Sequence, residues 1–283
     1  MRARSFLAAV LVIAVTNVAS ADTIRGISID FVPIGNAGNS ADTDGTVGCG
    51  AVGYNYRIGK YEVTNTQWNA FTTAVGDPTG NVYWPGAQQP INNVSWFEAA
   101  QFCNYLTSGN KYSGAYQFDQ SGNFLGIDRA SSISTYGTTY VIPTEDEWYK
   151  AAYFKPDGSG YSLYANGTDT APVAGVNSNY YTSSYYNGQP WNVGNGTQEQ
   201  NGTFDMMGNV LEWNETLLYG SYRGIRGGSF FIGGAYGLSS SIQSATYPYD
   251  EDFNVGFRVA SVPEPATLLL LGLGAAMLRK CKA

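Results

Sequence analysis

Histidine is absent from this chain of 283 residues, and cysteine occurs only three times. Histidine is the commonest general base near neutral pH and the commonest side-chain ligand of transition metals. Without it, a zinc or non-haem iron site would have to be built from carboxylates and cysteines alone. We therefore expect neither zinc nor iron in this protein.

Basic residues are also scarce. The chain has 15 Lys and Arg against 22 Asp and Glu, a net charge of −7, and only 13% of its residues are charged. So acidic a chain lacks the positive surface that binds nucleic acid, and we expect no nucleic-acid partner. Helical bundles need many charged surface residues, whereas this chain is rich in Gly (35) and Tyr (22). With 43% hydrophobic residues it can still build a core, so the composition indicates a loop-rich globular fold.

Residues 1–21 have the three parts of a secretory signal peptide. A basic start with Arg2 and Arg4 precedes the apolar run 6–15, and Ala19-Ser20-Ala21 is a small-residue cleavage site. We expect export and cleavage after Ala21. The alternative is a buried N-terminal helix, which fits the flanking residues poorly.

Residues 262–283 form a second terminal signal. Pro263-Glu-Pro265 precedes the apolar run 266–278, which is short for a membrane span of about 20 residues, and a basic end follows. This tail resembles the PEP-CTERM sorting signal that exosortases process in Gram-negative bacteria making extracellular polysaccharide. The resemblance implies an exosortase-type partner, transient membrane insertion of the tail, and a place on the outer cell surface or in the extracellular matrix. A plain C-terminal anchor is the alternative.

Two of the three cysteines lie between these terminal signals. Cys49 and Cys103 could pair in an oxidising compartment, while Cys281 belongs to the tail. Cys103, however, lies in an amphipathic helical segment that Ser95 can cap. A buried, inert thiol is therefore our preferred interpretation of Cys103.

The pattern of residues 22–260 predicts a single α+β domain with few regular elements and long ordered loops. Helices are expected where a cap precedes helical spacing, with Thr64, Ser95 and Thr144 as caps and Glu147 completing a capping box. The segment 111–134 is predicted to be a loop, and residues 154–203 show little of the apolar periodicity that indicates helices or strands. Strands are expected at 27–32, 54–58, 61–63, 209–213, 224–231 and 256–260.

Six sequence blocks stand in order along the chain, at residues 56–65, 90–96, 143–148, 204–213, 226–229 and 254–258. Together they resemble the formylglycine-generating enzyme (sulfatase-modifying factor) family, whose fold is a variant of the C-type lectin fold. Within them, Trp96, Trp148 and Trp213 are expected to be buried anchors. Arg226 and Arg258 are expected to form structural ion pairs or to bind carbonyl groups.

The departures from the family pattern concern its catalytic residues. In the sulfatase activators, two cysteines follow the block that resembles residues 226–229, bind copper(I) and attack the substrate. Here residues 230–241 contain no cysteine, and a hydroxyl cannot replace a thiolate as a Cu(I) ligand or in disulfide exchange. Leu211 also stands where the family usually has Trp beside the active site. We therefore expect no copper and no catalytic residues for formylglycine formation.

The resemblance does imply a calcium site. In the family the fourth block binds Ca²⁺ through a side-chain oxygen, two main-chain carbonyls and a glutamate, which correspond to Asp205, Gly208, Val210 and Glu212. Oxygen ligands of these kinds suit a hard cation. Alternatively, Asp205 and Glu212 only accept hydrogen bonds from turn amides.

Two functions remain open from the sequence. The first is a non-catalytic binding or structural module of the envelope, with extracellular polysaccharide or another surface protein as partner. The second is an oxidase or protein- or peptide-modifying enzyme of the same family that does not need the cysteine pair. An enzyme should have a pocket beneath Ser229 and Tyr236, whereas a binding module would have this space filled by Phe230, Phe231 or Leu211. The tyrosine-rich segment 179–191 suggests either sugar binding or simple packing of a loop.

Overall fold

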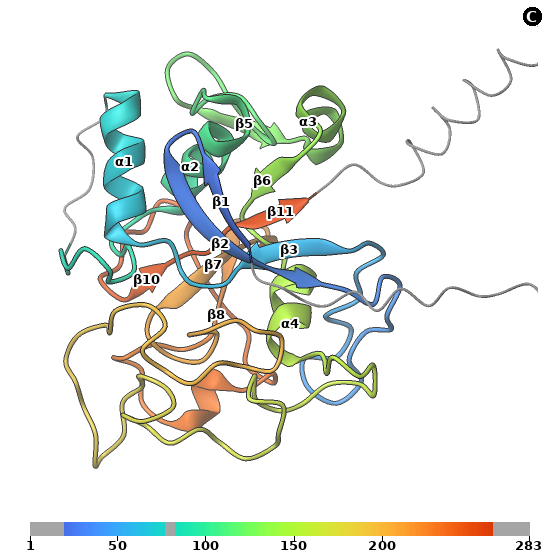
Figure 1. Ribbon diagram of the computed structural model, residues 1–283, viewed down its shortest axis with the longest axis vertical. Coiled ribbons are helices and arrows are strands. Elements are labelled where there is room, and N and C mark those ends of the chain that lie inside the picture. The colour runs from blue at the N-terminus through green and yellow to red at the C-terminus, as the bar shows by residue number, and fades with distance from the viewer. Residues whose placement is uncertain (1–19, 77–82, 263–283) are drawn as a thin grey trace, which may run out of the picture.

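Two sheets meet at the centre of the domain, and the last strand of the chain lies inside the larger one (Figure 1). The structure, a computed structural model, describes residues 20–76 and 83–262. Most of the expected signal peptide and nearly all of the sorting tail lie outside these residues. The five-stranded sheet has the order β1-β2-β3-β11-β6. Its strands are β1 (Ser20–Ile24), β2 (Ile27–Ile34), β3 (Tyr56–Gly59), β11 (Ala260–Val262) and β6 (Thr139–Val141).

Strand β11, near the C-terminal end of the described residues, pairs with strands from earlier parts of the chain. Ala260 is paired with Ile58 of β3 on one side and with Val141 of β6 on the other, both antiparallel. The second sheet has the order β10-β7-β8-β9, and a separate hairpin joins β4 to β5. These strands are β10 (Val255–Gly256), β7 (Leu211–Leu218), β8 (Tyr222–Arg226), β9 (Ser244–Thr246), β4 (Tyr116–Phe118) and β5 (Phe124–Ile127).

Three helices begin at the predicted caps. They are α1 (Asn65–Val75), α2 (Trp96–Ser108) and α4 (Glu145–Tyr153), with N-caps Thr64, Ser95 and Thr144. Each cap forms a complete capping box with Gln67, Glu98 or Glu147, so two backbone donors at each helix start are satisfied within the segment itself. The α+β, loop-rich character and these caps are confirmed.

Some predicted elements are wrong. Segment 111–134 is not a loop, because it holds the β4–β5 hairpin and most of α3 (Arg129–Tyr136). Segment 61–63 is not a strand. Its Val63 amide donates to Phe257 and its carbonyl accepts from Ile91, so it bridges two irregular segments instead of joining a sheet ladder. The strand expected at 224–231 ends at Arg226, and the one expected at 256–260 is divided between β10 and β11.

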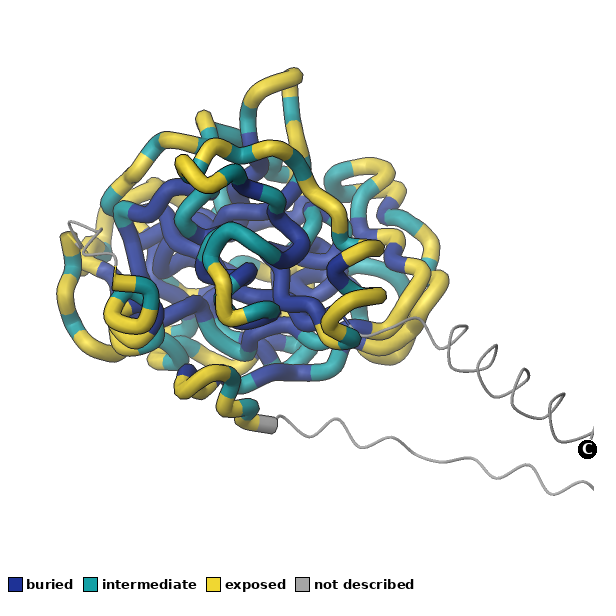
Figure 2. Tube along the Cα trace, turned by 90° about the horizontal axis from the view of Figure 1, so that it is seen from above, coloured by how far each residue is buried: buried dark blue, intermediate teal, exposed yellow. Residues whose placement is uncertain are grey.

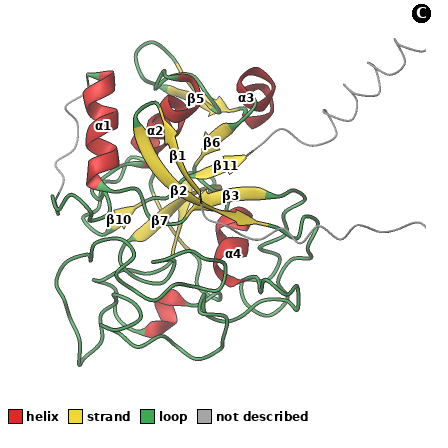
Figure 3. Ribbon diagram, in the orientation of Figure 1, coloured by secondary structure: helices red, strands yellow, loops and turns green. Residues whose placement is uncertain are grey.

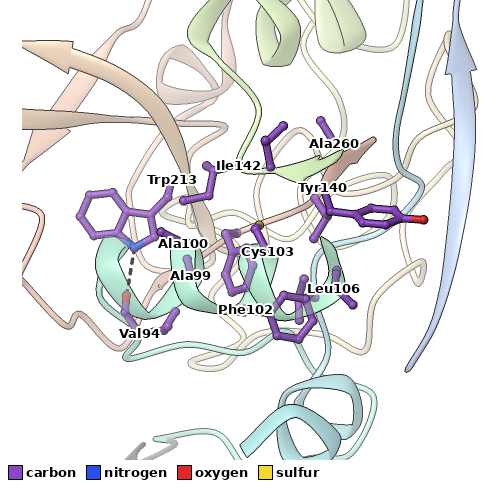
Figure 4. Packing of buried hydrophobic residues seen from close by; sticks show 14 of the residues in the cluster. Val94, Ala99, Ala100, Phe102, Cys103, Leu106, Tyr140, Ile142, Trp213 and Ala260 are labelled. Atoms are coloured by element: carbon purple, nitrogen blue, oxygen red, sulfur yellow. Dashed lines mark hydrogen bonds between the residues drawn. The ribbon is translucent and has the colours of Figure 1, made fainter. Parts of the chain in front are cut away.

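Helix α2 packs its apolar face into the larger of two hydrophobic clusters (Figure 4). Phe102 and Cys103 are fully buried there, near Ile142 and Ala260. Trp213 lies in the same cluster, and its indole nitrogen donates to the Val94 carbonyl at 2.9 Å. Trp96 joins α2 to β7, since its indole nitrogen donates to the Asn214 carbonyl at 3.0 Å. The three tryptophans expected to be buried anchors, Trp96, Trp148 and Trp213, are all buried.

Long loops make up the other half of the domain (Figure 3). Seen from above, exposed loop segments surround a buried interior (Figure 2). Between α4 and β7 the chain runs through residues 154–210 with isolated β-bridges only. Buried polar contacts hold these loops in place. The Asn201 amide, for example, donates to the carbonyls of Ala151 and Phe154 at the end of α4. Tyr180, in the tyrosine-rich segment, is buried and donates to Pro172.

Candidate functional site

The three residues expected at a pocket, Ser229, Tyr236 and Leu211, differ in their exposure. Ser229 is fully buried, and its hydroxyl accepts from the amide of Asn254 at 3.1 Å. Leu211 belongs to the larger hydrophobic cluster. Tyr236 lies on the 3₁₀ helix η1 (Ala235–Leu238), and 70% of its surface is exposed.

Aromatic side chains fill the region next to Ser229. Phe230 is only 1% exposed, and its ring lies 5.9 Å from Trp84 and 6.1 Å from Phe253, measured between centroids. Phe231 packs edge-on against Phe253 at 4.9 Å. The segment 230–241, which contains no cysteine, therefore begins with two packed phenyl rings, which offer neither a metal ligand nor a nucleophile.

Neither cysteine between the terminal signals is paired or reactive. Cys49 and Cys103 are both free, so the disulfide that we considered between them is not formed. Burial raises the pKa of Cys103 well above its ordinary value, and it raises the pKa of Cys49 to about 11. A thiol with a raised pKa has little thiolate near neutral pH and is a poor nucleophile. The prediction that Cys103 is buried is confirmed.

Arg226 is a structural residue, as predicted from the sequence. Its guanidinium forms a buried ion pair with Glu145 at the start of α4. The same group donates to the carbonyl of Ser240 at 3.1 Å and to the hydroxyl of Thr46 at 3.0 Å. Because these partners come from separate segments, one side chain fixes two loops against a helix.

Arg258 is also a structural residue, as predicted. It binds both carboxylate oxygens of Glu212 and donates to the carbonyls of Gly59 and Phe204. The indole nitrogen of Trp148 adds a third donor to Glu212 at 2.7 Å. Glu212, one of the four residues that the resemblance assigns to calcium, therefore already has an arginine partner.

The other three of those residues form a tight turn beside this pair. One oxygen of the Asp205 carboxylate accepts from the Gly194 amide at 2.6 Å. Within residues 20–76 and 83–262, no hydrogen bond reaches the carbonyl oxygen of Gly208 or Val210, although both residues are buried. Gly208 has φ +86°, and a Cβ there would lie 2.5 Å from the Asn179 carbonyl oxygen, so only glycine fits. Free carbonyl oxygens beside a carboxylate fit a hard cation.

Two further carboxylates surround this turn. Burial raises the pKa of Glu199 to about 8 and that of Asp205 to about 6, and it raises the pKa of Glu62 well above its ordinary value. The negative charge of neighbouring carboxylates adds to each shift, and Arg258 offsets part of it. No group of three His, Cys, Asp or Glu side chains in the described ranges is arranged as a metal site, so a cation here would need the backbone carbonyls.

Arg129 is a structural residue that our sequence analysis missed, because it lies on α3 in a segment taken for a loop. Its guanidinium bridges Glu147 at 2.9 Å and Glu215 at 3.0 Å, and it donates to the Ile142 carbonyl. The available signal was Asp128, which caps α3 by accepting from the Ser131 amide. Glu62 and Glu199 were also missed, because isolated acidic residues in irregular segments carry no pattern.

An open cavity of about 640 Å³ lies away from these residues. Its walls come from three segments, residues 39–45, residues 154–169 and Ser240. Neither Ser229, Tyr236 nor Leu211 lines it. Two of its carboxylates, Asp44 and Asp169, are exposed, and its aromatic side chains are Phe154 and Tyr161.

The comparisons with known proteins agree with this fold. Residues 34–262 match the Sulfatase-modifying factor enzyme 1-like domain. This chain belongs to that family. Residues 261–280 match the PEP-CTERM protein-sorting motif, which implies export and processing by an exosortase-type enzyme. No helix in residues 20–76 and 83–262 of this family member could cross a membrane, and the apolar run 266–278 lies beyond those residues.

Similar solved structures support the C-type-lectin-like fold of this family member. The Treponema denticola variable protein 1 has a TM-score of 0.65 and 22% identity, covering 88% of this chain and 100% of its own. CarF has a TM-score of 0.63 and 23% identity, with coverages of 84% and 99%. PvdO from Pseudomonas aeruginosa has a TM-score of 0.59 and 18% identity, and the alignment covers 88% of this chain and 99% of PvdO.

Among curated proteins, the chain is 28% identical over 177 residues to the chaperone protein LppX of Paenibacillus barcinonensis, an alignment that covers 56% of this chain. The chain spans 61% of the length of that relative.

Proposed function

We propose that this member of the sulfatase-modifying factor family is a non-catalytic binding module displayed outside the cell. The packing of Phe230 beside Ser229 supports this proposal most directly, since the ring occupies the region where a pocket for catalysis would lie. Two inert thiols and the absence of histidine leave no nucleophile or soft metal ligand for the family's oxidative chemistry.

The test is an assay for formylglycine formation. The exported protein is incubated with Cu(I), oxygen and a peptide carrying the sulfatase cysteine motif, and an active formylglycine-generating enzyme serves as the positive control. We expect the mass of the peptide to stay unchanged with this protein and to shift with the control. Conversion of the peptide cysteine to an aldehyde, abolished by Cys103→Ser or Cys49→Ser, would show that the protein is an enzyme.

We also propose that the turn at Asp205 binds Ca²⁺. Asp205 and the carbonyl oxygens of Gly208 and Val210 would hold the ion, and Glu212 would contribute negative charge from its pair with Arg258. The bound ion would neutralise part of the charge shared by Asp205, Glu62 and Glu199. Its role would be to stabilise the long loop 154–210.

A second candidate function is the binding of another exported polypeptide, since the curated relative is named a chaperone. The aromatic group beside Ser229 offers exposed rings for such a contact, with Tyr83 62% exposed and Phe231 50% exposed. Suppression of aggregation of an unfolded polypeptide, measured by light scattering, would distinguish this role. Phe231→Ser should weaken the suppression, whereas Tyr219→Ser should not, although Tyr219, between β7 and β8, is 83% exposed.

A further inference from the structure

The cavity of about 640 Å³ has a charge pattern that indicates its ligand. Its size falls within the range typical of small-molecule sites, roughly 300–1,000 Å³. Asp42, Asp44 and Asp169 all line it, and none of the described residues that line it is Lys or Arg. In residues 20–76 and 83–262, no ion pair involves these three aspartates.

Two of the three aspartates are held at fixed points of the cavity wall by hydrogen bonds to their carboxylates. Asp42 is 6% exposed; its carboxylate accepts from the Tyr149 hydroxyl at 2.6 Å and from the Asp44 amide at 2.9 Å. Asp169 accepts from the Leu163 amide through one oxygen at 2.9 Å. Hydrogen bonds therefore position the carboxylates of Asp42 and Asp169 in the wall, and Asp44 lines the same cavity with an exposed side chain.

Two aromatic rings complete the wall. Phe154 and Tyr161 pack edge to face, with ring centroids 5.1 Å apart. The Tyr161 hydroxyl donates to the Ser40 carbonyl at 2.8 Å, and the Asn39 amide donates to that hydroxyl at 2.7 Å, so the ring is fixed. Rings beside carboxylates are the usual surroundings of an organic cation, because the face of an aromatic ring attracts positive charge.

The domain around this cavity is acidic, and the nearby Lys150, whose ammonium lies 5.8 Å from the Phe154 ring, donates to the Asn36 carbonyl. Residues 22–262 contain ten basic and twenty-one acidic residues, a formal charge of −11. Four of the ten are arginines that already pair with carboxylates, namely Arg57, Arg129, Arg226 and Arg258. The Arg226 guanidinium lies 5.0 Å from the ring of Tyr149, whose hydroxyl binds Asp42, but its ion pair is with Glu145. The surrounding field therefore favours cations and repels anions.

We propose that this cavity binds a ligand carrying primary ammonium groups. Such groups occur in free polyamines and in polysaccharides with unacetylated amino sugars, and either source supplies the same chemistry. The inference rests on the proposed binding function and names its ligand class. It concerns a cavity that Ser229 does not line, and it needs no reaction.

The experiment measures binding by calorimetry with the exported protein at pH 6 and low ionic strength. The probes are spermidine, a glucosamine tetramer, and the N-acetylglucosamine tetramer as the neutral counterpart. Asp44→Asn and Asp169→Asn keep side-chain shape and remove one charge each. Asp157→Asn is the matched control, because Asp157 lies on the turn beside Gly158 but does not line the cavity.

We expect the amine probes to bind and the acetylated tetramer to bind at least about tenfold more weakly. Each cavity variant should raise the Kd of the amine probes about two- to fivefold, the effect of one exposed charge. Added salt should weaken binding, and Asp157→Asn should leave it unchanged. Tighter binding of the glucosamine tetramer than of spermidine would assign the site to polysaccharide, and the reverse order would assign it to free polyamine.

Equal binding of the acetylated tetramer would overturn the proposal, as would binding that the two cavity variants change no more than Asp157→Asn does. Absence of binding by every probe would overturn it too. These outcomes would leave the non-catalytic role standing, because the peptide assay tests that role separately.

Discussion

Replacing Arg129 by Met should destabilise the domain in a way that depends on pH. Arg129 is the only cation that bridges Glu147 and Glu215 in the described part of the chain, and the exposed fractions of the three side chains are 16%, 0% and 10%. Arg129→Met leaves two buried carboxylates without their partner, which costs about 3–5 kcal/mol near pH 7. For a domain of this size the melting temperature should fall by roughly 10 °C.

The sign of the pH effect follows from the two carboxylates. Burial alone would raise the pKa of Glu147, but Arg129 and the Tyr54 hydroxyl hold it below its ordinary value. In the native protein, Glu147 thus adds stability that is present above its unfolded pKa and is lost as the pH falls through its folded pKa. Burial raises the pKa of Glu215, and Arg129 limits that rise.

Without Arg129, burial would raise the pKa of both groups. Stability would then be lost as the pH rises through the folded pKa values and regained on acidification. Thermal melts of the native protein and the variant between pH 5 and 8 should therefore converge toward pH 5. Adding Glu215→Gln to Arg129→Met should recover part of the loss.

A control variant separates this effect from the loss of any arginine. Arg57→Met removes an ion pair with Asp22 whose side chains are 33% and 28% exposed, and should cost about 1 kcal/mol or less. A loss for Arg129→Met no larger than this, or a loss that is constant from pH 5 to 8, would refute the reasoning.

Three further predictions concern the ion, the thiols and the ends. Calcium at 100 times its Kd should add about 2.7 kcal/mol to the free energy of unfolding, so the melting temperatures measured with calcium and with chelator should differ. Asp205→Asn should erase this difference without breaking the Glu212–Arg258 pair. Under native conditions Cys103 should not react with a thiol reagent and Cys49 should react slowly, whereas both should react in denaturant; fast native labelling of Cys103 would contradict its burial. The intact mass of surface protein should correspond to a start near Asp22 and an end near Val262, and retention of residues 268–282 would contradict processing of the tail.

Local sequence was sufficient for the helix starts. The caps Thr64, Ser95 and Thr144 form hydrogen bonds with residues three positions away, so four consecutive residues determine each cap. The roles of Arg226 and Arg258 were also predictable, because a guanidinium in a glycine-rich block has few uses other than binding carboxylates or carbonyls.

Features assembled from distant segments were not predictable. Helix α3 reads RASSISTY, whose serines give no apolar stripe, so Arg129 lay in a segment without helical signal. The cavity depends on contacts such as Tyr149 to Asp42, which join residues 107 positions apart. No spacing rule connects such partners, since the loops between them have no period.

The position of β11 has a consequence for the order of events during export. This strand lies between β3 and β6, yet it ends at Val262, where the sorting motif has already begun. The sheet therefore cannot close until the chain has crossed the membrane almost to its end. Only Pro263, Glu264 and Pro265 then separate the closed sheet from the apolar run, a reach of at most about 14 Å. While the tail is in the membrane the domain would lie directly against the bilayer, and processing by the exosortase-type enzyme would remove that constraint.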